Sequence, residues 1–229
     1  MARITGPRLK NPGIIVVGDS FCSSPQGWPG LLAQKLGLHL INHGQGGQPW
    51  WNAKLFLDSL DKDTIDHADY LILVHTNSDR IPTNNVEVGL TNHARPDDSE
   101  LAQAVHLYYK HIHSANFLDW TQQQWFLYIG REWAHKKLVH LHSFPWSVQH
   151  SKLLTGLNIT TNLCSISLNE LGAEKLELFN DQRFNHLNEY NNQVLADQLC
   201  RVITDWRPGS VNLDMKQFDF KTTRWSDWH

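Results

Sequence analysis

Cysteine is scarce in this sequence, and its positions form no recognisable pattern. The 229 residues include three cysteines, Cys22, Cys164 and Cys200, which are widely spaced and odd in number. Such a set provides neither a disulfide framework nor the paired spacing of a CxxC metal site. The sequence therefore indicates a protein of a reducing compartment.

A long hydrophobic run is also missing. The first residues, MARITGPRLKNPG, are basic but are not followed by the apolar core of a signal peptide, and the next apolar run is far too short to cross a bilayer. We therefore expect no membrane-spanning segment and no secretion signal, which favours a cytoplasmic location or association with a virus particle.

Neither sign of charge is in large excess. Twenty Lys and Arg residues face 23 Asp and Glu residues, so the formal net charge is -3. Without a broad basic field, neither nucleic acid nor an anionic membrane surface is expected as a partner. The length and the 41% of hydrophobic residues suffice for one compact domain with its own core.

Aromatic residues are plentiful by comparison. The chain has 10 tryptophans and 14 histidines. Most of the tryptophans are expected to fill the core, but some must be partly exposed, and exposed aromatic rings are common on sugar-binding and protein-binding surfaces.

Buried strands and amphipathic helices alternate along the chain. Apolar runs predict strands at 13–18, 38–44, 70–74 and 138–141, and helical spacing predicts helices near 28–37, 50–60, 98–112, 120–133 and 187–206. This alternation predicts an α/β domain over residues 1–207, with a mostly parallel sheet and helices on both faces. Residues 208–229 are expected to form an irregular, aromatic-bearing C-terminal extension.

Polar residues follow these strands at the edge where such folds bind ligands. Four segments occur in order: VVGDSFCSS, INHGQGGQP, LVHTNSDR and FNHLNEYNNQVLADQL. Together they resemble the four sequence blocks of the SGNH (GDSL-type) hydrolases. The resemblance implies a three-layer α/β/α sandwich of flavodoxin-like type and the activity of a serine esterase or acyl hydrolase that needs no metal and no cofactor.

The resemblance also implies a role for particular residues. Ser20 takes the place of the nucleophile and His186 that of the base that accepts its proton. The backbone N–H groups of Ser20 and Gly47 and the side-chain amide of Asn77 take the places of the donors to the oxyanion.

The fourth block departs from the family pattern at the residue that orients the base. Arg183 stands three residues before His186, where the family has aspartate, and Leu187 stands where proline is common. Asp181 is the nearest carboxylate on that segment and is the candidate third member of a triad. The alternative is a Ser-His dyad in which a backbone carbonyl orients the imidazole ring.

Other polar residues have simpler interpretations. His140 and His142 lack Asp, Glu or Cys at ligand spacing, so they are interpreted as structural or surface residues and no metal site is predicted. Asp79 and Arg80 could line the mouth of the pocket, but they are more simply expected to form a surface pair. Cys22 has no adjacent histidine and is interpreted as a small packing residue.

Two hypotheses for the function follow. The first is a serine ester hydrolase whose substrate is a small molecule or a carbohydrate that carries an acetyl or other short acyl group. The alternative is a weakly active or inert SGNH-type module that binds within a larger assembly such as a virus particle, where the C-terminal extension could dock on a protein partner.

Overall fold

Six parallel strands form a single sheet at the centre of the molecule. The computed structural model describes residues 13–80, 82, 100–167 and 186–219, and the sheet has the order β2-β1-β3-β4-β5-β6. The strands are β1 (Gly13–Gly18), β2 (His39–Gly44), β3 (Ala68–His75), β4 (Lys137–His142), β5 (Leu157–Asn162) and β6 (Gly209–Val211). The four strands predicted from apolar runs are confirmed.

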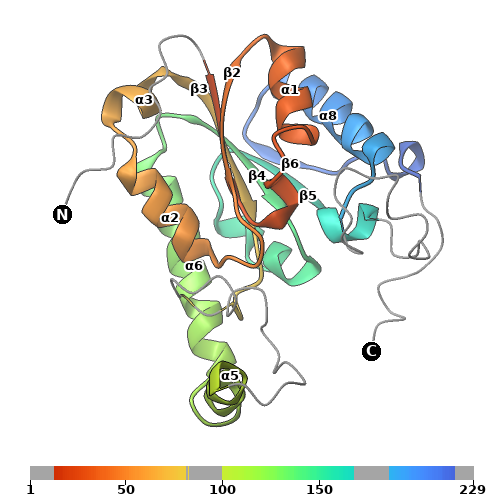
Figure 1. Ribbon diagram of the computed structural model, residues 1–229. Helices are drawn as coiled ribbons and strands as arrows, with labels where there is room; N and C mark the ends of the chain where they lie inside the picture. The colour runs from red at the N-terminus through yellow and green to blue at the C-terminus, as the bar shows by residue number, and fades with distance from the viewer. Residues whose placement is uncertain (1–12, 81, 83–99, 168–185, 220–229) are drawn as a thin grey trace.

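Helices cover both faces of the sheet. They are α1 (Trp28–Leu36), α2 (Trp50–Ser59), α3 (Lys62–His67), α5 (Glu100–His111), α6 (Ala115–Glu132) and α8 (Glu189–Thr204). Figure 1 shows α1 and α8 on one side of the sheet and α2, α3 and α6 on the other, with α5 beyond the end of the sheet. The predicted helices are confirmed with shifted ends, whereas α3 was not predicted.

Side chains of alternate residues along the strands build two cores. On β1, Ile14 and Val16 pack with α1 and α8, and Ile15 and Val17 pack with α2 and α6. Because both faces of the strand are buried, its sequence is continuously apolar rather than alternating. The result is a three-layer α/β/α sandwich, and the order of its first five strands is that of flavodoxin-like folds, as predicted.

Local signals in the sequence fix where several helices begin and end. Helix α1 has proline in its first turn and ends at Gly37, whose φ of 65° lies in the left-handed region that glycine adopts without strain. Asp61 caps α3 by accepting a hydrogen bond from the backbone N–H of Thr64. Asn188 caps α8 in the same way through the N–H of Asn191.

The expectation that the chain from residue 208 is an irregular extension was wrong for residues 208–219. Gly209–Val211 form β6 and pair with β5, while Leu213 and Phe218 are buried in the core that α1 and α8 cover. The backbone of Asp214 exchanges two hydrogen bonds with the Gln198 side chain on α8. A strand of three residues is too short to be recognised as an apolar run. Residues 220–229 lie outside the described part of the chain.

This arrangement predicts that the start of the tail stabilises the domain. Replacing Leu213 by alanine is expected to lower the free energy of unfolding by about 2–3 kcal/mol, because it removes buried apolar contacts and leaves a cavity. Chemical denaturation measures this loss. The matched control is Leu127→Ala at an exposed leucine on α6, with an expected change within about 0.5 kcal/mol. Equal stability of the two variants would show that the tail adds nothing to the core.

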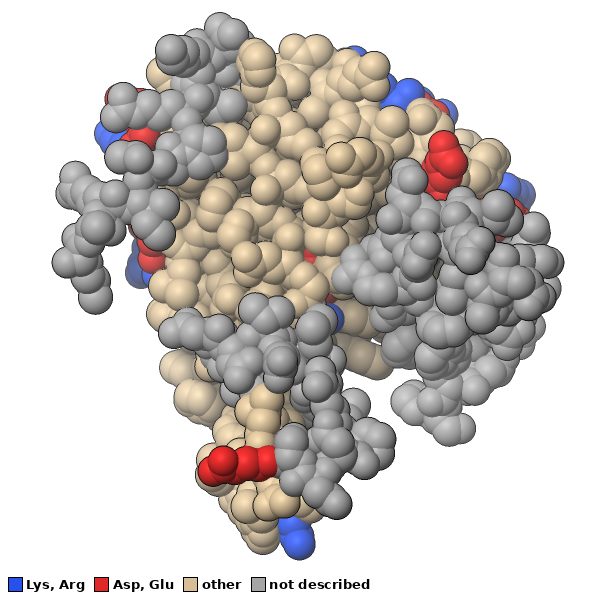
Figure 2. Space-filling view, in the orientation of Figure 1, with Lys and Arg blue, Asp and Glu red and all other residues tan. Residues whose placement is uncertain are grey.

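Charged side chains of both signs lie on the described surface, as the sequence indicates (Figure 2). Figure 2 shows scattered charged side chains on the face it presents, without a broad patch of one sign. None of the helices in the described residues has both the length and the apolar character that crossing a membrane requires.

Candidate active site at the carboxyl edge of the sheet

Hydrogen bonds tie together the loops that leave the carboxyl ends of the central strands. The N–H of Gln45, after β2, donates to the carbonyl of Gly18 at 3.1 Å, and the N–H of Ser143, after β4, donates to the carbonyl of His75 at 2.8 Å. The Asn42 side chain of β2 donates to the carbonyl of Cys22 at 2.7 Å. These bonds join the end of β2 to the loop after β1, and the loop after β4 to the end of β3.

Ser20 begins a short helical turn directly after β1. Asp19 caps this 3-10 turn (Ser20–Cys22) by accepting a hydrogen bond from the N–H of Phe21 at 3.1 Å. The Ser20 residue is 8% exposed. Within the described residues its hydroxyl makes no hydrogen bond, so the oxygen is not engaged in local structure.

His186 stands two residues before the N-cap of α8, and its ring packs on the turn that carries Ser20. The imidazole stacks on the ring of Phe21 with centroids 4.7 Å apart and an angle of 19° between the planes. Asn192 on α8 holds the backbone beside it, because its side-chain amide donates to the carbonyl of Leu187 at 3.0 Å and accepts from the N–H of Trp28 at 2.8 Å. The start of α8 and the start of α1 thus fix the segment that carries His186.

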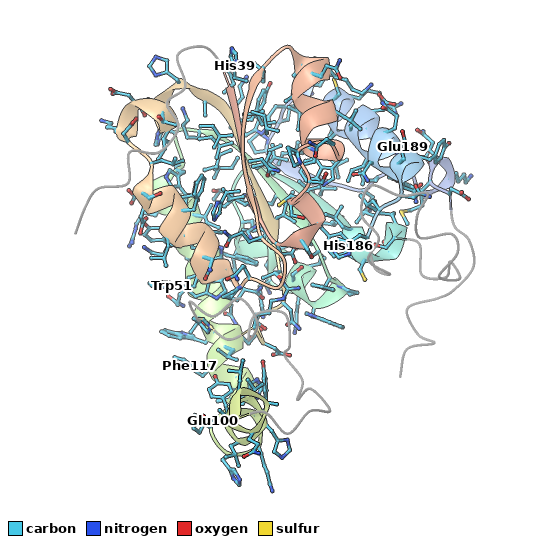
Figure 3. All side chains as sticks on the ribbon, viewed as in Figure 1. His39, Trp51, Glu100, Phe117, His186 and Glu189 are labelled. Carbon is cyan, nitrogen blue, oxygen red and sulfur yellow. The ribbon has the colours of Figure 1, made fainter. Side chains whose placement is uncertain are left out.

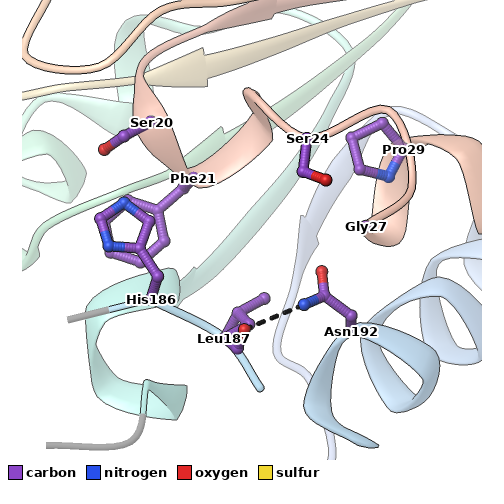
Figure 4. A pocket seen from close by; sticks show the side chains of 8 residues that line it. All are labelled: Ser20, Phe21, Ser24, Gly27, Pro29, His186, Leu187 and Asn192. Atoms are coloured by element: carbon purple, nitrogen blue, oxygen red, sulfur yellow. Dashed lines mark hydrogen bonds between the residues drawn. The ribbon is translucent and has the colours of Figure 1, made fainter. Parts of the chain in front are cut away.

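Ser20 and His186 line the same pocket. Figures 3 and 4 place His186 at the start of the α8 segment, and Figure 4 shows both side chains beside Phe21, on the side of the pocket opposite Gly27 and Pro29. The cavity among the described residues measures about 20 Å³. The remaining lining residues are Ser24, Leu187 and Asn192. The first and fourth sequence blocks, far apart in the chain, therefore meet at one small pocket.

A buried ion pair lies directly beside Ser20. Asp19 is fully buried, and its Oδ2 accepts a hydrogen bond from Nη1 of Arg80 at 3.1 Å. Its Oδ1 accepts from the Ser143 hydroxyl at 2.8 Å. Nη1 of Arg80 also donates to the carbonyl of Gln48 at 3.0 Å. Three loops are thus joined at one guanidinium.

This ion pair corrects the expectation for Asp79 and Arg80. They do not form a surface pair: Arg80 is 8% exposed, pairs with Asp19 and lies over the ring of Phe144 at 5.4 Å. Burial lowers the pKa of the Arg80 guanidinium, while the Asp19 carboxylate opposes that shift. Asp79 instead donates its backbone N–H to the side chain of Asn77. Adjacent opposite charges in a sequence do not show which of them turns inward.

The two other predicted oxyanion donors lie on the loops joined by Arg80. Gly47 is buried in the turn between β2 and α2 with a φ of 70°, a conformation that favours glycine. Asn77, half-buried after β3, accepts a hydrogen bond from the N–H of Asp79 at 3.1 Å through its side-chain oxygen. Among the described residues, neither Gly47 nor Asn77 lines the pocket that Ser20 and His186 share.

Asp181, the predicted third member of a triad, lies outside the described residues, as does Arg183. The choice between a triad and a dyad therefore stays a prediction.

Cys22 lies in the core, at the end of the turn that begins with Ser20. It is 1% exposed, and burial raises the pKa of its thiol well above the usual value, with a further contribution from Asp19. A thiol held neutral in the core is a packing residue, as predicted.

Three buried histidines, His75, His140 and His142, lie next to one another behind this edge of the sheet, and we call them the histidine chain. Nε2 of His140 lies 2.8 Å from the carbonyl oxygen of Thr155, which can only accept, so that nitrogen carries the proton. Nδ1 of His140 then accepts from Nε2 of His75 at 3.0 Å. His142 bonds to the side-chain oxygen of Asn158 at 2.8 Å. The structural interpretation of His140 and His142 is confirmed.

Burial makes this histidine chain neutral. It lowers the pKa of His140 to about 3 and that of His142 to about 4. The pKa of His75 also lies well below its usual value, first because of burial and then because of its two histidine neighbours. In the described part of the chain, no group of three or more His, Cys, Asp or Glu residues is arranged to hold a metal ion.

Comparisons with known proteins identify similar structures but no similar sequence. No protein-family model and no curated protein matches the chain. One similar structure, from Desulfitobacterium hafniense DCB-2, is named for the G-D-S-L family of lipolytic proteins. It is 14% identical with a TM-score of 0.44, over 84% of this chain and 99% of the other. Another is the lipase/acylhydrolase from Enterococcus faecalis, 12% identical with a TM-score of 0.47, over 88% of this chain and 100% of the other. At this level of similarity the comparison does not bear on activity.

Proposed function

We propose that this protein is a serine ester hydrolase. The observation that carries the proposal is the meeting of Ser20 and His186 at one pocket, at the edge of the sheet where parallel α/β folds bind their ligands. A hydroxyl outside local hydrogen bonding and an imidazole on the neighbouring turn are the two groups that acyl transfer to serine requires.

The reaction would proceed through an acyl-enzyme. The Ser20 oxygen attacks the ester carbonyl carbon while His186 accepts the hydroxyl proton, and collapse of the tetrahedral intermediate expels the alcohol, which takes the proton from His186. Water then attacks the acyl carbon, again with His186 as base, and releases the carboxylic acid. Ser20 regains its proton.

The negative charge of each tetrahedral intermediate needs donors that are already in place. The N–H of Ser20, the N–H of Gly47 and the amide of Asn77 are the proposed donors, and a preorganised donor of this kind is worth about 3 kcal/mol. Asp79 holds the Asn77 side chain at both ends: its N–H donates to the side-chain oxygen at 3.1 Å, and its carboxylate accepts from the amide nitrogen at 3.5 Å. The second amide hydrogen is left for the oxyanion.

The proposed substrate is an ester with a short acyl group. Phe21 and Pro29 give the pocket beside Ser20 apolar walls, which suit the hydrocarbon part of an acyl group. Acetyl is among the smallest acyl groups. A carbohydrate as the carrier of the acetyl group is suggested by the large number of tryptophans; the exposed Trp51 lines another cavity, between α2 and α6.

Covalent labelling tests the proposal directly. A fluorophosphonate probe, which reacts with activated serines, is expected to label the wild type at Ser20 and to leave the Ser20→Ala variant unlabelled. Hydrolysis of p-nitrophenyl acetate should be lost in the same variant, because the nucleophile is gone.

The matched control is Ser59→Ala, which removes an exposed hydroxyl at the end of α2. It should be labelled and active like the wild type. Equal labelling of the wild type and Ser20→Ala would contradict the proposal. A folded wild type that neither reacts with the probe nor hydrolyses esters would favour the alternative, an inert module that binds within an assembly.

A further inference from the structure

We propose that Arg80 is the positioning residue that aligns the three oxyanion donors. This inference rests on the proposed ester hydrolysis and assigns a role to a residue outside the predicted triad and oxyanion set. Its basis is a juxtaposition: both hydrogen-bond acceptors of the guanidinium belong to sequence neighbours of proposed donors. The guanidinium itself does not line the pocket shared by Ser20 and His186.

The connection to the first donor runs through Asp19. Nη1 of Arg80 donates to Oδ2 of Asp19 at 3.1 Å, and Asp19 directly precedes Ser20. The other carboxylate oxygen holds the N–H of Phe21, so Asp19 fixes the turn on both sides of Ser20. The direction of the Ser20 N–H therefore depends on where Arg80 holds this carboxylate.

The connection to the second donor uses the same nitrogen. Nη1 of Arg80 donates its other hydrogen to the carbonyl of Gln48 at 3.0 Å, and Gln48 directly follows Gly47. The left-handed conformation of Gly47 gives this turn an unusual path, which the bond to Arg80 helps to hold. One nitrogen atom thus links the backbone beside both proposed N–H donors.

The third donor is connected through the backbone of Arg80 itself. The N–H of Arg80 donates to the carbonyl of Asn77 at 3.5 Å, which closes the turn that carries the Asn77 amide. The guanidinium is buried and lies over the ring of Phe144 at 5.4 Å. Because arginine presents a rigid planar group, the three loops are held at fixed distances from one another.

Replacing Arg80 by lysine tests whether Arg80 acts by positioning the loops or only by neutralising the charge of Asp19. The Arg80→Lys variant keeps a positive charge for Asp19, but the lysine side chain has a shorter reach, is more flexible and lacks the planar fork of arginine. We expect Arg80→Lys to fold and to bind substrate with KM within about twofold of wild type. Its kcat should fall about tenfold or more, because displacements near 1 Å at a reacting centre can cost about a hundredfold in rate.

Steady-state kinetics of wild type, Ser20→Ala, Arg80→Lys and Gln198→Leu on p-nitrophenyl acetate test the inference. Gln198→Leu is the matched control, since it breaks a buried polar contact on α8 away from the pocket and should lower stability without changing kcat. Asp19→Asn, which keeps the size of the side chain and weakens the anchor for Arg80, should also lower kcat and serves if Arg80→Lys does not fold.

The outcomes distinguish the two proposals. Activity that depends on Ser20 together with a fall in kcat for Arg80→Lys supports the positioning role. Activity that depends on Ser20 but wild-type kcat in both Arg80→Lys and Asp19→Asn overturns the positioning role alone. Activity that Ser20→Ala does not reduce overturns the proposed hydrolysis, and the positioning role with it.

Discussion

Replacing Arg80 by methionine is expected to lower the free energy of unfolding by about 3–5 kcal/mol. The methionine fills much of the same volume but leaves the fully buried Asp19 carboxylate without its cation. Breaking one side of a buried ion pair is costly because the remaining charge stays in a medium of low polarity. The carbonyl of Gln48 also loses its donor. Guanidinium chloride denaturation of the two proteins measures the difference.

A double variant identifies the cause of this loss. Asp19→Asn combined with Arg80→Met removes both charges, so it is expected to be more stable than Arg80→Met alone. The matched control is Arg131→Met on α6, where an exposed arginine is replaced and the change should stay within about 0.5 kcal/mol. An Arg80→Met protein within about 1 kcal/mol of wild type would show that the ion pair is not a main support of this edge.

The ion pair also marks the limit of what the sequence could predict about the site. Ser20 and His186 were predicted from the resemblance to the SGNH sequence blocks, and their positions supported it, because one follows a strand, the other precedes the last amphipathic helix, and both lie at the same edge of a parallel sheet. Arg80 was misjudged because its partners, Asp19 and the carbonyl of Gln48, lie on other loops. A contact between loops depends on how the strands are ordered, which the local sequence does not contain.

The fold shows the same division between local and long-range signals. Strands β1 and β3 were predicted because burial on both faces requires continuous apolar runs. Strand β5 has the sequence LNITTN, and its polar residues conceal it from that criterion. Asn158 on this strand accepts a hydrogen bond from His142, so its polarity reflects a partner on the neighbouring strand. Side chains that satisfy each other in the core look like surface residues in the sequence.

The histidine chain on β3 and β4 is expected to make the protein unstable at moderately acidic pH. The unfolded chain gains a proton at each histidine near the ordinary pKa of about 6.5, whereas folded His142 stays neutral down to a pH of about 4 and folded His140 down to about 3. Between these limits the unfolded state binds more protons, so stability falls as the pH falls. His75, whose pKa is also well below its usual value, adds to this slope. Each of the three histidines contributes up to about 1.4 kcal/mol per pH unit, and above a pH of about 7 none contributes.

Denaturation curves at several pH values between about 4.5 and 7.5 measure how steeply stability depends on pH, and a substitution shows which histidine is responsible. His140→Gln removes one of the three buried histidines while keeping an amide that can donate to the carbonyl of Thr155. Below a pH of about 6, the free energy of unfolding of His140→Gln should depend on pH less steeply than that of wild type, by about 1.4 kcal/mol per pH unit. His106→Gln, at an exposed histidine on α5, should retain the wild-type slope. A wild-type slope in His140→Gln would mean that this histidine takes up its proton in the folded protein as readily as in the unfolded chain, and that the buried chain is not what limits stability in acid.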